Sequence, residues 1–193
     1  HDALPILSFE GTAGDRIYLD LLGSSGFTSR YVNWIMRDPY GNAFITGDIA
    51  DQERPLAHTG TYRLEIEPEY FLSPANTGSV QFEIVSITDT TTAMPLGTDV
   101  SGTISEAGQQ DAYTFTLADD TDLLFDSLTG DISDNFRWYL DGPTGRVVSD
   151  AIVDRDRSYS NAVAGDYTLT IDAWGDRTGD YSFRLVDVDA EAA

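Results

Sequence analysis

The residues best suited to chemistry are aspartates gathered in two short stretches of the chain. The candidate ligands in these stretches are Asp119, Asp120, Asp122, Asp154 and Asp156. Calcium binds six to eight oxygen ligands, and closely spaced carboxylates in loops supply them. Neither an EF-hand pattern nor a Gly-Gly-x-Gly-x-Asp repeat accompanies these aspartates. Two interpretations stay open: calcium that assists the protein without being required, or a solvated acidic surface.

Aromatic side chains in loops form the second group of candidates. Trp174 lies in the turn-like stretch 172–177 between two predicted strands, and Tyr70 and Phe71 lie in a similar connection earlier in the chain. An aromatic ring beside Asp and Arg could stack on a sugar ring or on a side chain of a partner. The alternative is that Trp174 folds back over the edge of a sheet.

The sequence gives little support for catalysis. The two histidines are His1 and His58, and no Gly-x-Ser-x-Gly stretch presents a nucleophile. Neither His-Glu-x-x-His nor Cys-x-x-Cys occurs, so the familiar metal motifs of enzymes are missing from the sequence. We therefore expect no enzyme activity, and we expect His58 to be a surface loop residue.

An internal duplication organises the chain that carries these candidates. The segment 34–41 (WIMRDPYG) matches 138–145 (WYLDGPTG), and 60–66 (GTYRLEI) matches 165–171 (GDYTLTI). Such self-similarity predicts two similar domains in tandem. It also tests proposed sites: a glycosidase pair made of Asp20 and Glu65 would exist in only one copy, because Glu65 aligns with Thr170.

The matched segments alternate apolar and polar residues with a period of two. Tyr62, Leu64 and Ile66 share one face, and Tyr113, Phe115 and Leu117 share another. This alternation is typical of antiparallel strands with one face on a core and one in water. The same pattern predicts that Trp34 and Trp138 are core residues and do not stack on sugars at the surface.

We therefore predict an all-β fold made of two tandem, jelly-roll-like antiparallel β-sandwich domains. The first domain covers residues 1–95 and the second covers residues 96–193. The second is expected to open with an extra strand near 96–104 that has no counterpart before His1, so we expect the first domain to be short by one strand. The start without Met or a signal peptide suggests a fragment of a longer protein.

Composition narrows the choice of partners. The chain has 33 acidic and 11 basic residues, a net charge of −22, and no cysteine. Such a surface repels nucleic acid and anionic lipid, so we expect neither as a partner. No apolar run approaches the ~20 residues that cross a bilayer, so we expect no membrane insertion.

The strand motifs resemble the bacterial pre-peptidase C-terminal domain family. The motifs are 111–117 (DAYTFTL), 165–171 (GDYTLTI) and 179–185 (GDYSFRL), with weaker versions at 60–66 and 78–84. The resemblance implies a small β-sandwich attached to a secreted protease or repeated in a surface protein, without catalysis of its own. It also implies that collagen, polysaccharide or calcium binding is within the family's range.

Two functions remain open from the sequence. The first is a non-catalytic accessory or structural repeat pair of a secreted or cell-surface bacterial protein, which presents a neighbouring domain or holds a protein partner. The second is a carbohydrate- or matrix-binding module, assisted by calcium, that uses Trp174, Tyr70 and Phe71. If the first domain lacks a strand, its open sheet edge also predicts self-association.

Overall fold

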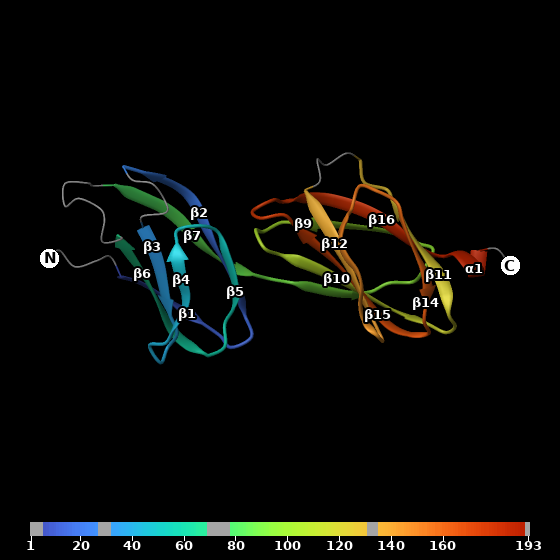
Figure 1. Cartoon of the computed structure of the whole chain (residues 1–193), viewed down its shortest axis with the longest axis horizontal. Helices are drawn as coiled ribbons and strands as arrows, with labels where there is room; N and C mark the ends of the chain where they lie inside the picture. Colours follow the sequence, from blue (N-terminus) through green and yellow to red (C-terminus); the bar gives the residue numbers. More distant parts are fainter. Residues whose placement is uncertain (1–5, 27–31, 69–77, 131–134, 192–193) are drawn as a thin grey trace. The chain divides into compact units, whose positions relative to one another are not determined.

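The computed structural model describes residues 6–26, 32–68, 78–130 and 135–191. The chain divides into two compact units, His1–Ile87 (unit 1) and Thr88–Ala193 (unit 2), and each unit is considered by itself (Figure 1). The division lies eight residues before the position 95/96 expected from the sequence. The physical reason is a short strand, β8 (Thr90–Ala93), which pairs in parallel with β10 (Gln110–Leu117) and so belongs to unit 2.

Unit 1 contains two sheets built from seven described strands. The sheet orders are β1-β6-β3-β4 and β5-β2-β7. The strands are β1 (Ile6–Gly11), β2 (Arg16–Ser25), β3 (Val32–Arg37), β4 (Ala43–Asp48), β5 (Gln52–Pro55), β6 (Gly60–Pro68) and β7 (Ser79–Ile87). The described strand pairs of this unit are antiparallel, as the sequence alternation predicts.

Unit 2 contains a five-stranded and a four-stranded sheet. Their orders are β13-β12-β15-β10-β8 and β14-β11-β16-β9. Besides β8 and β10, the strands are β9 (Asp99–Ile104), β11 (Thr121–Ser127), β12 (Phe136–Gly142), β13 (Gly145–Ile152), β14 (Arg157–Ala162), β15 (Gly165–Ala173) and β16 (Gly179–Asp187). A four-residue helix, α1 (Val188–Glu191), follows the last strand. The prediction of an all-β fold is confirmed.

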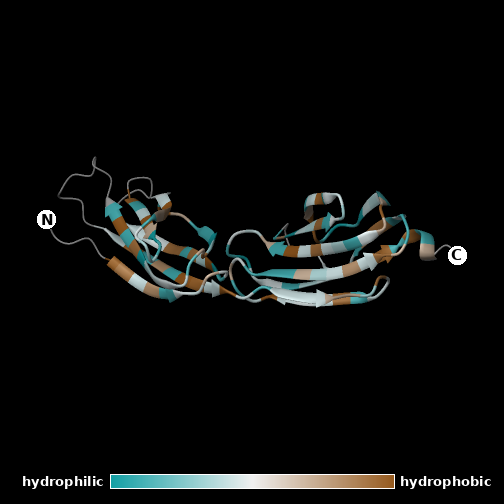
Figure 2. Ribbon diagram, turned by 90° about the horizontal axis from the view of Figure 1, so that it is seen from below, coloured by the Kyte–Doolittle hydropathy of each residue, from teal (hydrophilic) through white to brown (hydrophobic). Residues whose placement is uncertain are grey.

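Each unit has its own hydrophobic core, filled by the inward residues of its strands. Figure 2 shows the alternation of hydrophobic and hydrophilic residues along the strands. Trp34 is 0% exposed in the core of unit 1, and Trp138 is 1% exposed in the core of unit 2. Both tryptophans are core residues, as expected, because a strand that alternates in this way must bury one face.

Seven strands of unit 1 correspond to seven strands of unit 2 when the sheet orders are compared. In unit 1, Phe9 stacks on Tyr62 with ring centroids 5.4 Å apart, and in unit 2 Phe115 stacks on Tyr167 at 5.3 Å. These pairs place β1 and β10 in the same position in the two units. The strands β8 and β9 have no equivalent among the described strands of unit 1. Unit 2 thus has two strands more than the described part of unit 1, whereas the sequence predicted a difference of one strand.

A matching turn fixes the start of the central strand in each unit. Gly60 opens β6 with a φ of +143°, and Gly165 opens β15 with a φ of +138°. A Cβ on Gly60 would lie 3.0 Å from the ring of Pro39, and one on Gly165 would collide with Pro143. Glycine is therefore required at both positions, since other residues rarely adopt this conformation.

Within the part of the chain that the structure describes, no helix has the length and apolar character needed to cross a membrane.

Candidate functional site

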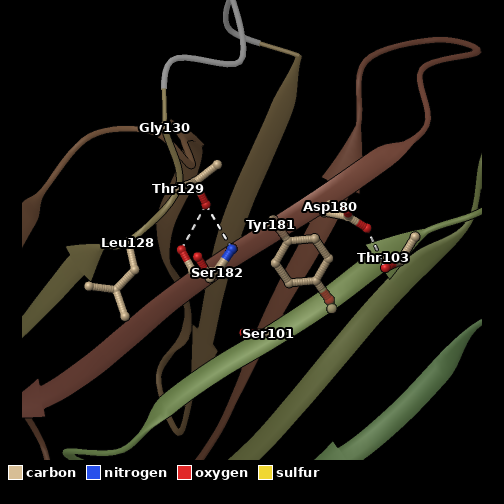
Figure 3. Close-up of a pocket in the computed structure, with 9 residues that line it drawn as sticks. Ser101, Thr103, Leu128, Thr129, Gly130, Asp180, Tyr181 and Ser182 are labelled. Atoms are coloured by element: carbon tan, nitrogen blue, oxygen red, sulfur yellow. Dashed lines mark hydrogen bonds between the residues drawn. The ribbon is translucent and has the colours of Figure 1, made fainter.

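A hollow in unit 2 lies over the neighbouring strands β9 and β16. It has a volume of about 530 Å³ and is open to solvent. Leu128, which follows β11 and is 41% exposed, forms part of its wall (Figure 3). The lining residues are Ser101, Gly102, Thr103, Leu128, Thr129, Gly130, Asp180, Tyr181 and Ser182.

Polar side chains at this hollow form hydrogen bonds within the protein. The Thr129 hydroxyl donates to the carbonyl oxygen of Ser182 at 2.7 Å and accepts from its backbone N–H at 2.8 Å (Figure 3). The Thr103 hydroxyl donates to Asp180 Oδ1 at 2.6 Å. The first two bonds hold the loop that follows β11 against β16. The third bond joins β9 to β16. The hydroxyls of Thr103 and Thr129 therefore have hydrogen-bond partners within the protein.

A buried polar network lies beneath this surface, and the sequence did not point to it. Tyr181 donates its hydroxyl proton to Asp111 Oδ2 at 2.6 Å, and its oxygen lies 2.7 Å from that of Tyr113. Gln109 Nε2 and the Thr90 hydroxyl donate to Asp111 Oδ1 at 3.0 and 2.7 Å. Asp111 is 4% exposed and Tyr181 is 2% exposed. The network joins β8, β10 and β16 and thereby links the two sheets of unit 2.

Burial keeps the phenols of this network protonated. Desolvation raises the pKa of Tyr181, and its hydrogen bond with Asp111 raises that pKa further. Desolvation also raises the pKa of Tyr113. A phenol with a raised pKa does not serve as a general base near neutral pH. The network therefore acts as part of the scaffold.

Trp174 is exposed yet held in place. The residue is 61% exposed, and its backbone N–H donates to the carbonyl oxygen of Asn135 at 2.8 Å. The guanidinium carbon of Arg137 lies 5.2 Å from the centre of the ring. Arg177 donates to Asn135 Oδ1 at 2.8 Å and so braces the same loop. The structure does not fold Trp174 into the core, and the other two aromatic candidates, Tyr70 and Phe71, lie outside the described residues.

The aspartates proposed as calcium ligands hold loops by accepting backbone hydrogen bonds. Asp120, Asp122 and Asp156 accept from the N–H groups of Ala164, Asn161 and Ser127 at 2.8, 2.8 and 2.9 Å. Asp154 lies 3.8 Å from Arg155, and Asp119 is exposed. In the described ranges, no three acidic or histidine side chains gather in a way that could hold a metal ion. Calcium binding remains a prediction.

Unit 1 carries a smaller polar hollow beside His58. The hollow has a volume of about 480 Å³, and the wall includes Tyr40, which is 76% exposed. The Tyr40 ring meets the His58 ring edge-on at 4.9 Å, and His58 Nε2 lies 3.8 Å from Asp38 Oδ2. A side-chain hydrogen bond from Asn42 holds the pKa of Asp38 below its usual value. Asp38 organises its own turn, so the cluster is a surface feature as predicted for His58.

Comparisons with known proteins assign no family. No protein-family model matches the chain, and no curated protein matches it. Among solved structures, the pre-peptidase C-terminal domain of a Bacillus anthracis collagenase is 18% identical, with a TM-score of 0.41 over 49% of this chain and 93% of that domain. The lysozyme inhibitor PliG of Aeromonas hydrophila is 12% identical, with a TM-score of 0.40 over 52% and 97%.

A third structure matches along nearly the whole chain. The CUB1-EGF-CUB2 region of human MASP-1/3 is 9% identical, with a TM-score of 0.33 over 96% of this chain and 94% of that one. Similarity at these levels assigns neither a family nor an activity, because sandwich folds host many unrelated functions.

Proposed function

We propose that the chain is a non-catalytic accessory module of a secreted or cell-surface bacterial protein, and that it holds a protein partner. The observation that carries this proposal is Trp174, an exposed aromatic ring that the backbone and Arg137 hold in a fixed position. Tryptophan and arginine are the side chains that most often dominate protein interfaces. A ring held in place loses little conformational freedom on binding, which favours affinity.

The placement of the acidic groups supports a role without catalysis. Asp111 is enclosed by hydrogen-bond donors from Tyr181, Gln109 and Thr90. A general base must reach the proton that it removes, and a carboxylate with this surrounding does not reach solvent. Hydrolysis of peptide or glycoside substrates that is lost on Asp20→Asn or Glu65→Gln would overturn this part of the proposal.

The net charge indicates what kind of partner fits. With −22 charges, the chain attracts basic surfaces and repels acidic ones. Long-range attraction of this kind raises the rate of association and weakens with salt. A partner with a basic or neutral contact surface is therefore expected.

A carbohydrate or matrix partner is the second candidate, and the exposed ring of Trp174 is the observation that favours it. Sugar rings present C–H faces that stack on aromatic rings, and a few polar contacts then set specificity. Arg137 of β12 lies against this ring, and Arg177 is bonded to Asn135 beside it, so both could supply such contacts. Calcium would assist only if its binding brought together carboxylates that do not gather among the described residues.

Removing the Trp174 ring should abolish most of the binding under either proposal. We expect Trp174→Ala to weaken binding by at least about tenfold, since a central aromatic contact is worth about 1.4 kcal/mol or more. Arrays of collagens and of glycans, probed with the labelled chain with and without EDTA, provide the measurement. Tyr40→Ala, which removes the exposed aromatic ring of unit 1, is the matched control and should leave binding unchanged.

The array also separates the candidates. Binding to collagens supports a matrix partner and binding to glycans supports a carbohydrate partner, and both belong to the second function. A loss in EDTA would add calcium to either. Equal binding by Trp174→Ala and the unchanged chain would refute the assigned contact, and no binding on any array would remove the carbohydrate and matrix alternative.

A further inference from the structure

The strand β7 of unit 1 and the strand β16 of unit 2 hold matching positions but have different neighbours. β16 pairs with β11 on one side and with β9 on the other (Figure 1). β7 pairs with β2, and no described strand pairs with its second edge. Along a free edge, alternate residues direct their backbone N–H and C=O groups outward. As far as its described residues go, unit 1 therefore has a free strand edge at the position that β9 fills in unit 2.

Burial along the two strands differs accordingly. In β16, Tyr181, Phe183 and Leu185 are 2%, 0% and 2% exposed. Their counterparts in β7, Val80, Phe82 and Ile84, pack against the core of unit 1 but stay partly exposed. The difference is what the loss of a covering strand would produce, because the inward face of an edge strand is protected on one side only.

A hollow lies next to this open edge, lined by residues of β1, β2 and β7. Its volume is about 230 Å³, and its apolar lining includes Phe9, Ile17, Leu56 and Ile84. In β1 itself, Ile6 and Leu7 are 62% and 44% exposed. The open side of unit 1 is therefore both a strand edge and an apolar recess.

In unit 2 a segment of the chain covers the corresponding side. The backbone N–H of Met94 donates to the carbonyl oxygen of Thr114 in β10 at 2.9 Å, and that of Gly97 donates to Leu185 in β16 at 2.8 Å. Met94 is 7% exposed and belongs to the core. The segment thus passes from the edge of one sheet to the edge of the other and then forms β9.

The charges along the edge are reversed between the units. Arg184 of β16 lies 2.6 Å from Asp126 of β11 and 3.8 Å from Asp99 of β9. The register of β7 places Glu83 opposite Asp20, where unit 2 has Arg184 opposite Asp126. Like charges directly opposite one another on a sheet are unfavourable. A strand that added to β7 would be favoured by a basic residue at the position that Asp99 occupies in β9.

We propose that the open side of unit 1 binds an extended segment of another polypeptide as an antiparallel strand on β7, with apolar residues opposite Val80 and Phe82 and a basic residue opposite Glu83. This mode is strand addition, in which backbone hydrogen bonds give affinity and alternate side chains give specificity. The inference deepens the proposed binding of a protein partner, but it rests on unit 1 and not on Trp174.

A second copy of this chain fits the edge poorly. The strand β7 has no basic residue, so pairing of two β7 strands would bring Glu83 near acidic or neutral side chains. Each copy also carries −22 charges, which repel at low salt. Self-association through the edge, expected from the sequence, is therefore a competing outcome of the experiment below.

At one position the incoming strand can carry a larger side chain than β9 can. A Cβ on Gly102 would collide with the Tyr181 hydroxyl, so β9 requires glycine there. The counterpart of Tyr181 in β7 is Val80, which is much shorter. A β-branched residue opposite Val80 would therefore be accommodated and would favour the extended conformation.

The test uses a labelled synthetic peptide with the sequence of residues 94–105, changed by Asp99→Lys and Gly102→Val, and the full chain. We expect the lysine peptide to bind about fivefold more tightly than the same peptide with Asp99 kept, as measured by fluorescence anisotropy. The Glu83→Arg chain should reverse this order, because the charge at the edge is then basic. A lysine peptide that is N-methylated at alternate residues should not bind, since it lacks the N–H donors of a strand.

Several outcomes would overturn the proposal. One is equal binding of the N-methylated and unmodified peptides, and another is no binding of either peptide. A third is an unchanged order of affinities in the Glu83→Arg chain. Sedimentation could also show a concentration-dependent dimer whose stability changes with Glu83→Arg. If the peptide does not dissociate this dimer, the edge binds a second copy of the chain. Trp174→Ala should leave peptide binding intact, so failure here and failure of the proposed Trp174 contact are distinguishable.

Discussion

Trp138→Ala should lower the free energy of unfolding of unit 2 by about 4 kcal/mol, the usual cost of truncating a large buried aromatic residue. Trp138 is 1% exposed and stacks on Phe125 with ring centroids 4.4 Å apart. Truncation removes this stacking and leaves a cavity that a close-packed core does not fill. Denaturant unfolding followed by NMR peak intensities, assigned to each unit, measures the effect.

The matched variant in unit 1 is Trp34→Ala. Trp34 is 0% exposed, meets Phe82 edge-on at 5.3 Å and donates from Nε1 to the carbonyl oxygen of Ala50 at 3.0 Å. Because the two cores are built from separate sets of residues, each variant should shift the transition of its own unit. Equal shifts of both transitions in both variants would show that the cores are not independent.

Asp111→Ala should destabilise unit 2 by about 3 kcal/mol, since it leaves buried donors without an acceptor, each at a cost of about 1 to 3 kcal/mol. The donors are the Tyr181 hydroxyl, Gln109 Nε2 and the Thr90 hydroxyl. The same unfolding experiment measures this effect. Unit 1 should be unaffected, because Asp111 and these donors all belong to unit 2.

The control for this variant is Asp180→Ala. Asp180 also accepts a hydroxyl proton, from Thr103 at 2.6 Å, but the bond is exposed. Water replaces exposed hydrogen bonds, so the cost should stay below about 1 kcal/mol. If Asp111→Ala and Asp180→Ala cost the same small amount, the buried network does not hold the two sheets of unit 2 together.

The fold class and the core could be predicted from the sequence because both follow from local alternation. Tyr62 and Leu64 are 1% and 0% exposed, and Tyr113 and Phe115 are each 7% exposed, as their alternating segments predict. The tryptophans of β3 and β12 follow the same rule. In each case the side chain and its neighbours two residues away carry the whole signal.

The rest depends on contacts between residues far apart in the chain. The strand β8 is a Thr-Thr-Thr-Ala segment without apolar alternation, and its pairing with β10 supplies what its own sequence lacks. Because of this pairing, the observed boundary between the units lies at 87/88 and not at the predicted 95/96. Residue patterns alone do not reveal such partners, since β propensity depends on the neighbouring strands.

The candidate sites show the same limit. The sequence placed Trp174 in a turn but did not decide whether its ring folds back over the sheet edge. The role of Asp111 required knowing that Tyr181 meets it across the sheets. A signal for the open edge was present in the duplication. Val80 replaces Tyr181 and Glu83 replaces Arg184 between matched strands, and such a loss of a large residue and reversal of charge marks a changed neighbour.

Native-state amide hydrogen exchange along β7 and β16 tests most directly whether one unit is closed and the other open. Amides of β16 should exchange slowly at consecutive positions, because strands flank it on both sides. Along β7, slow and fast amides should alternate, since only those directed toward β2 are bonded. Slow exchange at consecutive positions of β7, equal to that of β16, would contradict the account.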